Sequence, residues 1–277
     1  MPYLTGRFTD GSEMKKLITS KTKEIKLSLI ESRAEKRLES VDLSELHIAT
    51  NLEYLSSGFS LHITQQNLDD IAKCSNLKSL TLSTPERLNF SCLAKTKIEK
   101  MWLWGAEINI DSFSDLDSLE ELSISTAHDE DIDLQKLPRN LYYLRLSLSQ
   151  LQLNLSQIGL PKLTSLILEN LPPQQIDIPE KIASNLATLA LRNCANIGTF
   201  MSDSFRHNRK LRFLNLEGSN WENLHVDYFC TMPTLKRVLM TDTCGIYADL
   251  KSKSNPNGTV KFANKNAFKQ FKDSIGY

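Results

Sequence analysis

The chain has 277 residues, and its 33 basic and 33 acidic residues give a formal net charge of zero. Hydrophobic residues make up 40%, a composition that excludes a disordered chain. A neutral chain lacks the basic excess with which proteins bind nucleic acid or anionic membranes, so neither partner is expected. No run approaches 18 apolar residues, so membrane insertion is not expected either. Leucine is strongly enriched, at 44 of the 277 residues.

The first 40 residues do not show the regular leucine spacing of the later chain. Their pattern predicts a short helix near residues 12–18, a strand near residues 23–30 and a charged helix near residues 31–39. The N-terminus carries no apolar segment of signal-peptide length. The five cysteines are widely spaced without a C-x-x-C pair, which favours buried, reduced thiols over a disulfide framework or a zinc cluster. We therefore expect a cytoplasmic protein.

The pattern L-x-x-L-x-L, with other large apolar residues allowed, recurs eight times from residue 77 onward. Its fourth and sixth positions point to the same side of a short strand. One repeat cannot bury its own leucines, so neighbouring repeats must stack and share a core. The first positions lie 21 to 25 residues apart, at Leu77, Ile98, Leu119, Leu141, Leu163, Leu186, Leu211 and Leu235. Less regular registers are expected to start at Thr22, Leu43 and Gly58.

The segments that connect the predicted strands, called returns below, are of two kinds. Pairs such as Leu88 and Phe90 in the central repeats alternate apolar with polar residues, so we expect extended or short turn segments there. Residues 67–74 and 223–229 instead predict helical returns. Residues 245–277 predict a turn, a strand and a final helix.

The repeat resembles the leucine-rich repeat family, whose period is 20–29 residues. The resemblance implies an α/β solenoid, curved, with a parallel β-sheet on its concave face. Returns would be mostly extended or turn-like in the central coils and helical near the ends. Terminal coils need covers over the core and the sheet edges, so we assign residues 1–40 to an N-terminal cap, 41–244 to the solenoid and 245–277 to a C-terminal cap. The ninth repeat position, often Asn or Cys in the family, fits well only at Cys194, which predicts uneven turns.

In this family, side chains at repeat positions three, five and seven project from the concave strand face. Exposed Trp, Tyr and Arg side chains are enriched at binding hot spots. A first candidate patch centres on two tryptophans of one repeat and comprises Lys100, Trp102, Trp104, Ser123, Tyr143 and Arg145. A second comprises Arg192, Phe213, Asn215, Glu217 and Arg237, and Glu169 lies on the same face. The alternative is that the two indoles pack on the aliphatic parts of neighbouring side chains and only stiffen the sheet.

The neutral net charge conceals a segregation of charges. Residues 107–133 hold ten acidic residues and no Lys or Arg, whereas residues 251–277 hold six lysines and one acid. The acidic run would either steer a basic partner or form a solvated outer surface.

We find no sequence motif for catalysis, a cofactor or a metal, so an enzyme is not expected. The best interpretation is a non-catalytic module that binds a protein partner on its concave face, as an effector or as an adaptor or substrate receptor. A bacterial effector of this type would be delivered into a host cell. One alternative is an immunity or inhibitor protein that occludes a toxin or enzyme. Another is a sensor of a small molecule or glycan. We expect a monomeric or weakly associating chain.

Overall fold

The chain divides into two compact units in a computed structural model. The first comprises residues 1–127 and 136–140, and the second comprises residues 128–135 and 141–277. The structure describes residues 2–27, 37–58, 61–105, 108–126, 133–148, 153–174, 176–194, 197–200, 202–219, 221–224 and 234–239.

The first unit begins with a small antiparallel sheet, ordered β2-β1-β4. Its strands are β1 (Tyr3–Phe8), β2 (Glu13–Leu17) and β4 (Leu38–Asp42). The helix expected near residues 12–18 is wrong, because these residues pair with β1 as strand β2. The turn between them places Gly11 at a φ of 82°, a backbone conformation that glycine adopts without strain. The charged helix expected at residues 31–39 falls largely outside the described residues, and its last two residues belong to β4.

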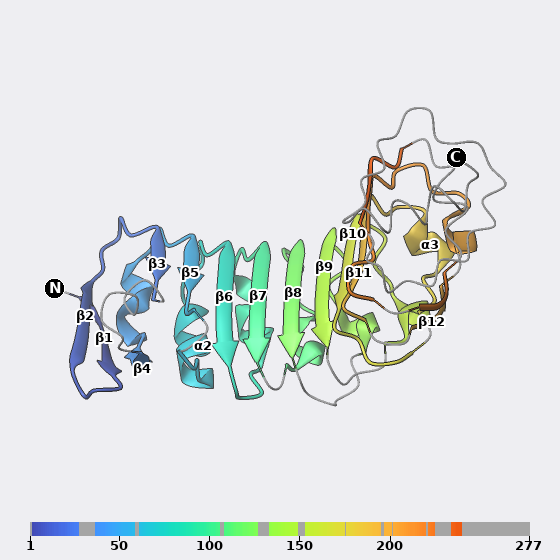
Figure 1. Cartoon of the computed structure of the whole chain (residues 1–277). Coiled ribbons are helices and arrows are strands. Elements are labelled where there is room, and N and C mark those ends of the chain that lie inside the picture. Colours follow the sequence, from blue (N-terminus) through green and yellow to red (C-terminus); the bar gives the residue numbers. More distant parts are fainter. Residues whose placement is uncertain are drawn as a thin grey trace. The chain divides into compact units, whose positions relative to one another are not determined.

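Five further strands of the first unit lie side by side and parallel (Figure 1). They are β3 (Glu24–Lys26), β5 (Tyr54–Ser56), β6 (Ser79–Thr84), β7 (Lys100–Gly105) and β8 (Glu121–Thr126). The register starting at Thr22 is confirmed by β3, but the next two are wrong. The residues after Leu43 form the 3-10 helix η1 (Ser44–Ile48), and the following strand is β5 instead of a strand after Gly58.

The leucine pattern misses β5 for a physical reason, which lies in the side chains of the repeat that contains this strand. Leu52 and Leu55 are buried and hold the first and fourth positions of its repeat. The sixth position is Ser57, which is also buried and accepts a hydrogen bond from the backbone N–H of Ser83 at 3.0 Å. A polar residue therefore fills the inward position that a leucine pattern requires, so the pattern hides this strand.

The returns of the first unit follow the predicted division. Helix α2 (Gln65–Ile71) confirms the helical return at residues 67–74, and Thr64 caps it in a capping box with Asn67. The central returns are short 3-10 turns, η2 (Phe90–Lys95) and η3 (Ile110–Phe113). An isolated parallel bridge joins Leu88 to Ile108 before these turns. A further 3-10 turn, η4 (Leu134–Lys136), spans the division between the two units.

The second unit continues the repeat with five parallel strands. They are β9 (Tyr143–Leu148), β10 (Ser165–Glu169), β11 (Thr188–Arg192), β13 (Phe213–Asn215) and β15 (Arg237–Leu239). The returns contain η5 (Leu155–Gln157), α3 (Glu180–Ala183) and η6 (Ser202–Phe205). Strands β12 (Ile197–Phe200) and β14 (Trp221–Leu224) form a separate parallel pair.

The predicted helix at residues 223–229 is therefore wrong where it overlaps β14, and its remainder lies outside the described residues. The elements expected at residues 245–277 also lie outside them. All eight regular repeats, in contrast, have a strand in the predicted phase. Their inward leucines, such as Leu80, Leu82, Leu189 and Leu191, are fully buried. Burial of each such side chain contributes about 1.5–3 kcal/mol.

Ser219 shows how a residue other than Asn can serve at the ninth repeat position. In the second unit, the buried hydroxyl of Ser219 accepts from the backbone N–H of Cys194 at 3.1 Å and donates to the carbonyl of Leu191 at 2.7 Å. The residues just before this position are Asn170, Asn193 and Gly218, all with φ between 51° and 70°. A residue with left-handed φ thus follows each of these three strands, and Asn and Gly are the residues that tolerate this conformation best.

Candidate binding surface on the strand face

In the first unit, the outward side chains of three neighbouring strands can be read directly from the strand register. Trp102 on β7 lies between Thr81 on β6 and Ser123 on β8. Trp104 lies between Ser83 and Ser125 in the same way. The tryptophans therefore occupy neighbouring positions on one face of one strand, with hydroxyl residues on both sides.

The two indoles differ in exposure. Trp102 is 40% exposed, although Thr81 and Ser123 beside it are each only 6% exposed. Trp104 is half-buried and makes a further contact of its own. The hydroxyl of Thr81 is buried without a hydrogen-bond partner among the described residues. Trp102 is thus the large apolar side chain that this face offers to solvent, while Trp104 is partly engaged with the protein.

A charged pair lies at the start of the same strands. Lys100 on β7 and Glu121 on β8 are register partners, and the Lys100 Nζ lies 2.7 Å from a carboxylate oxygen of Glu121. The Lys100 side chain is 47% exposed and that of Glu121 16% exposed, and an ion pair with such access to water contributes only modestly to stability. It does fix the Lys100 side chain across the strands beside the tryptophans.

In the second unit, the predicted residues Arg145, Glu169 and Arg192 form one continuous chain of ion pairs. Glu169 on β10 is 3% exposed. Its Oε2 accepts from Nε and Nη2 of Arg145 on β9, at 3.0 and 2.6 Å. Its Oε1 lies 3.1 Å from Nε of Arg192 on β11 but outside hydrogen-bond geometry, so this second contact is purely electrostatic.

The other predicted residues of the second unit are arranged less closely. Tyr143 and Phe213 are half-buried on β9 and β13. Asn215 donates from its Nδ2 to Oε2 of Glu217 at 3.1 Å, which holds that carboxylate beside the end of β13. Arg237 begins β15, but its side chain is not among those described.

The structure therefore brings the predicted residues together in two groups. Lys100, Trp102, Trp104 and Ser123 share the strand face of the first unit, while Tyr143 and Arg145, predicted for the same patch, belong to the second unit. The sequence analysis missed the ion-pair chain. Its signal was the spacing of opposite charges, since Arg145, Glu169 and Arg192 lie 24 and 23 residues apart, which is one repeat.

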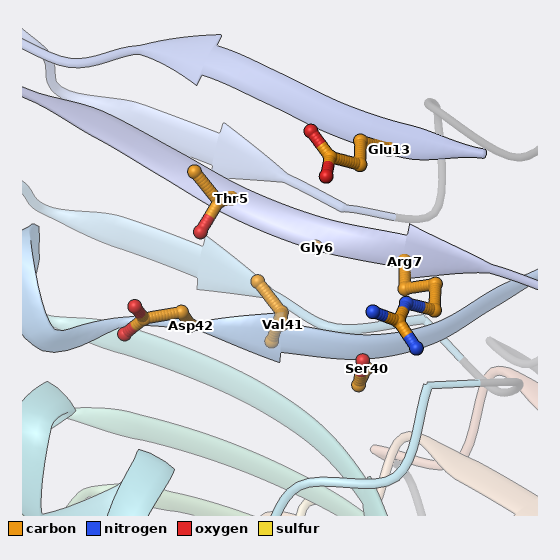
Figure 2. Close-up of a pocket in the computed structure, with 7 residues that line it drawn as sticks. All are labelled: Thr5, Gly6, Arg7, Glu13, Ser40, Val41 and Asp42. Atoms are coloured by element: carbon orange, nitrogen blue, oxygen red, sulfur yellow. The ribbon is translucent and has the colours of Figure 1, made fainter. Parts of the chain in front are cut away.

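A separate shallow pocket of about 420 Å³ lies on the N-terminal sheet. Figure 2 shows that its lining side chains come from β1, β2 and β4. Arg7 and Glu13 are register partners there. Asp42 is the last residue of β4, and the backbone N–H of Ser44 lowers the pKa of its carboxyl by donating a hydrogen bond to it. The ionisable groups of the pocket are thus one arginine and two carboxylates, which form no nucleophile–base pair.

Metal and thiol chemistry find no support in the described part of the chain. No group of three or more His, Cys, Asp or Glu side chains there could hold a metal ion. Burial raises the pKa of the Cys74 and Cys92 thiols to about 11 in each case, with further contributions from Asp70 and Asp69 respectively. These thiols are therefore poor nucleophiles at neutral pH. No helix among the described residues is long and apolar enough to cross a bilayer.

Solved structures with the same architecture are leucine-rich repeat proteins. An internalin from Listeria monocytogenes matches with a TM-score of 0.52 and 20% identity, over 81% of this chain and 71% of the internalin. A leucine-rich repeat protein of Leptospira interrogans matches with a TM-score of 0.53 and 17% identity, over 79% of this chain and 62% of that protein.

A third match is the leucine-rich repeat ectodomain of the plant membrane receptor kinase GASSHO1/SCHENGEN3 from Arabidopsis thaliana, solved in complex with CASPARIAN STRIP INTEGRITY FACTOR 2. Its TM-score is 0.51 and its identity 20%, over 72% of this chain and 25% of the ectodomain. No protein-family model and no curated protein matches the sequence. The fold of this chain is thus a leucine-rich repeat solenoid, as the repeat predicts.

Proposed function

We propose that this chain is a non-catalytic module that binds a protein partner on its strand face, with Trp102 as the main anchor. The observation that carries the proposal is the 40% exposure of Trp102 between two nearly buried hydroxyl residues. A Trp side chain gives a large contact area with few rotatable bonds, which is why it is enriched at binding hot spots. Trp104 and Lys100 would extend the contact along the same strand.

The fold supports a binding role of this kind. Stacked repeats present a continuous strand face on which outward side chains vary without disturbing the core. The plant ectodomain of the same fold was solved with a bound factor, which shows such a module engaged with a partner. Effector, adaptor or substrate receptor in the cytoplasm remains our proposal for the biological setting.

The experiment is a capture assay with the full chain, read by mass spectrometry, followed by affinity measurement on the captured protein. Trp102→Ala should weaken binding by about tenfold or more, the range of a hot-spot residue. Tyr3→Ala is the matched control, because Tyr3 is an aromatic residue of the same unit with 41% exposure. Equal affinity of a folded Trp102→Ala variant and the wild-type chain would refute the anchor.

The captured material also separates the alternatives. Several regulatory or host proteins favour an effector or adaptor. One dominant enzyme at a one-to-one ratio favours an immunity or inhibitor protein. A sensor of a small molecule or glycan would capture no protein, and its melting temperature would rise with the ligand.

A further inference from the structure

The ion-pair chain of Arg145, Glu169 and Arg192 is not required by the fold. The carboxylate of Glu169 is buried on the strand face, and removing a charge from water costs several kcal/mol before any pairing. Serines occupy the same seventh repeat position in other coils, at Ser83, Ser125 and Ser147. A small hydroxyl residue therefore suffices there, and the buried charge calls for another explanation.

The ion pairs among Arg145, Glu169 and Arg192 carry an excess of positive charge and of hydrogen-bond donors. Two guanidinium groups flank one carboxylate, which leaves one uncompensated positive charge. Arg145 and Arg192 have side chains that are 37% and 42% exposed. Each guanidinium has five N–H donors, and Arg145 directs only its Nε and Nη2 donors at Glu169. The remaining donors are available on an exposed face.

The surroundings of the two arginines suit a short acidic side chain. The register places Ile167 and Ala190 side by side between Arg145 on one side and Asn215 on the other. Ala190 has the smallest side chain of this row and is 2% exposed. The neighbouring acid Glu217 is bound by Asn215. Among the described residues, no ion pair joins Glu217 to Arg192.

We propose that Arg145 and Arg192, positioned by Glu169, recognise an aspartate or glutamate side chain of the protein partner. This inference rests on the proposed function and adds the chemistry of the partner. The aliphatic part of the acidic side chain would lie over Ala190 and Ile167, and its carboxylate would accept from both guanidiniums. Arginine suits this role because its planar donor fork matches a carboxylate.

The test uses the full chain and a fluorescein-labelled octaglutamate peptide that is amidated at its C-terminus, so that all its carboxylates are side chains. Binding is followed by fluorescence anisotropy at low ionic strength, about 20 mM salt, where screening is weak. Arg145→Gln and Arg192→Gln should each weaken binding by about fivefold, the upper range for a partly exposed ion pair. Arg139→Gln is the charge-matched control, because Arg139 is exposed on a turn, and its affinity should stay within about twofold.

Removal of either arginine leaves Glu169 with less compensation, and the variant could lose its fold. Arg192→Lys keeps the charge beside Glu169 and loses only the fork, so a folded Arg192→Lys variant with weakened binding supports the site. Wild-type affinity in folded Arg192→Gln and Arg145→Gln variants would overturn it. Competition by inorganic phosphate as strong as that by free glutamate would also overturn the assignment to an acidic side chain. Neither result bears on Trp102, whose role is tested on the captured partner.

Discussion

Replacement of Asn208 tests how far polar side chains hold the second unit together. Asn208 is fully buried. Its Nδ2 donates to the carbonyls of Ala183 and Leu186, at 2.5 and 2.8 Å, and both belong to the preceding coil. Its Oδ1 accepts from the backbone N–H groups of Lys210 and Leu211, at 2.8 and 2.7 Å. One side chain thus satisfies four backbone groups in two coils.

Asn208→Ala removes all four hydrogen bonds at once. At about 1 kcal/mol of net stability for each bond, the loss is about 4 kcal/mol. With a slope of about 2 kcal/mol per M, the urea midpoint of the unfolding transition should fall by about 2 M. The transition is followed by circular dichroism. Asn185→Ala is the matched control, since the half-buried Asn185 only donates a long bond of 3.4 Å to the carbonyl of Lys181 and accepts an exposed bond of 2.9 Å from Nζ of Lys210. Neither bond satisfies a buried backbone group, so this variant should cost about 1 kcal/mol or less.

Asn208→Asp separates the donated bonds from the accepted ones. The new carboxyl keeps the two accepted bonds, but its other oxygen faces two carbonyl oxygens in place of the amide donor. Burial and these two dipoles raise the pKa of the introduced carboxyl in the folded state above its unfolded value of about 3.9. The folded state then binds more protons, so the stability loss is complete above the folded pKa and shrinks as the pH falls toward the unfolded value.

The reasoning would be refuted by two results. A midpoint for Asn208→Ala within about 0.3 M of the wild type would show that the four bonds add no net stability. A loss for Asn208→Asp that is independent of pH between 4 and 7 would show that the introduced carboxyl is not buried against the carbonyl groups.

Two further predictions concern buried hydroxyl and thiol groups. Ser219→Ala leaves the buried backbone N–H of Cys194 without a partner and should cost about 2–3 kcal/mol in the same urea assay, whereas the exposed Ser156→Ala should cost about 0.5 kcal/mol or less. Equal midpoints for these two variants would contradict this bridging role. Because burial raises the pKa of the Cys74 and Cys92 thiols to about 11, iodoacetamide at pH 8 should alkylate them about a hundredfold more slowly in the native chain than in urea. Site-resolved mass spectrometry measures this rate, and native alkylation as fast as in urea would show that the thiols are ionised.

The repeat could be predicted from sequence because its signal is local and phased. Leu80 and Leu82 are two positions apart, and the next coil repeats that spacing at Met101 and Leu103. Where a polar residue takes an inward position, as Ser57 does, the signal is lost. Strand β2 was misread for a different reason. Its apolar residues Met14 and Leu17 have helical spacing, and only pairing with β1 makes the segment a strand.

The polar contacts could not be predicted in the same way. Asn208 donates to carbonyls 25 and 22 residues earlier in the chain, and nothing near it in sequence indicates those partners. The candidate sites could be predicted in part. The exposure of Trp102 follows from its repeat position, but the partial burial of Trp104 two residues later does not. Its environment depends on side chains of neighbouring coils, which the repeat pattern leaves undetermined.

Inward and outward positions of this fold carry different information. The inward positions are leucines because stacking coils require an apolar core, so they explain stability and say nothing of a partner. At the outward positions, Thr81 and Ser123 show that a small hydroxyl residue satisfies the fold. Trp102 beside them exposes apolar area, and Glu169 in the second unit buries a charge between two arginines. Each departs from the local requirement at a cost in solvation. The proposed binding roles account for both departures, and the two binding experiments test each of them separately.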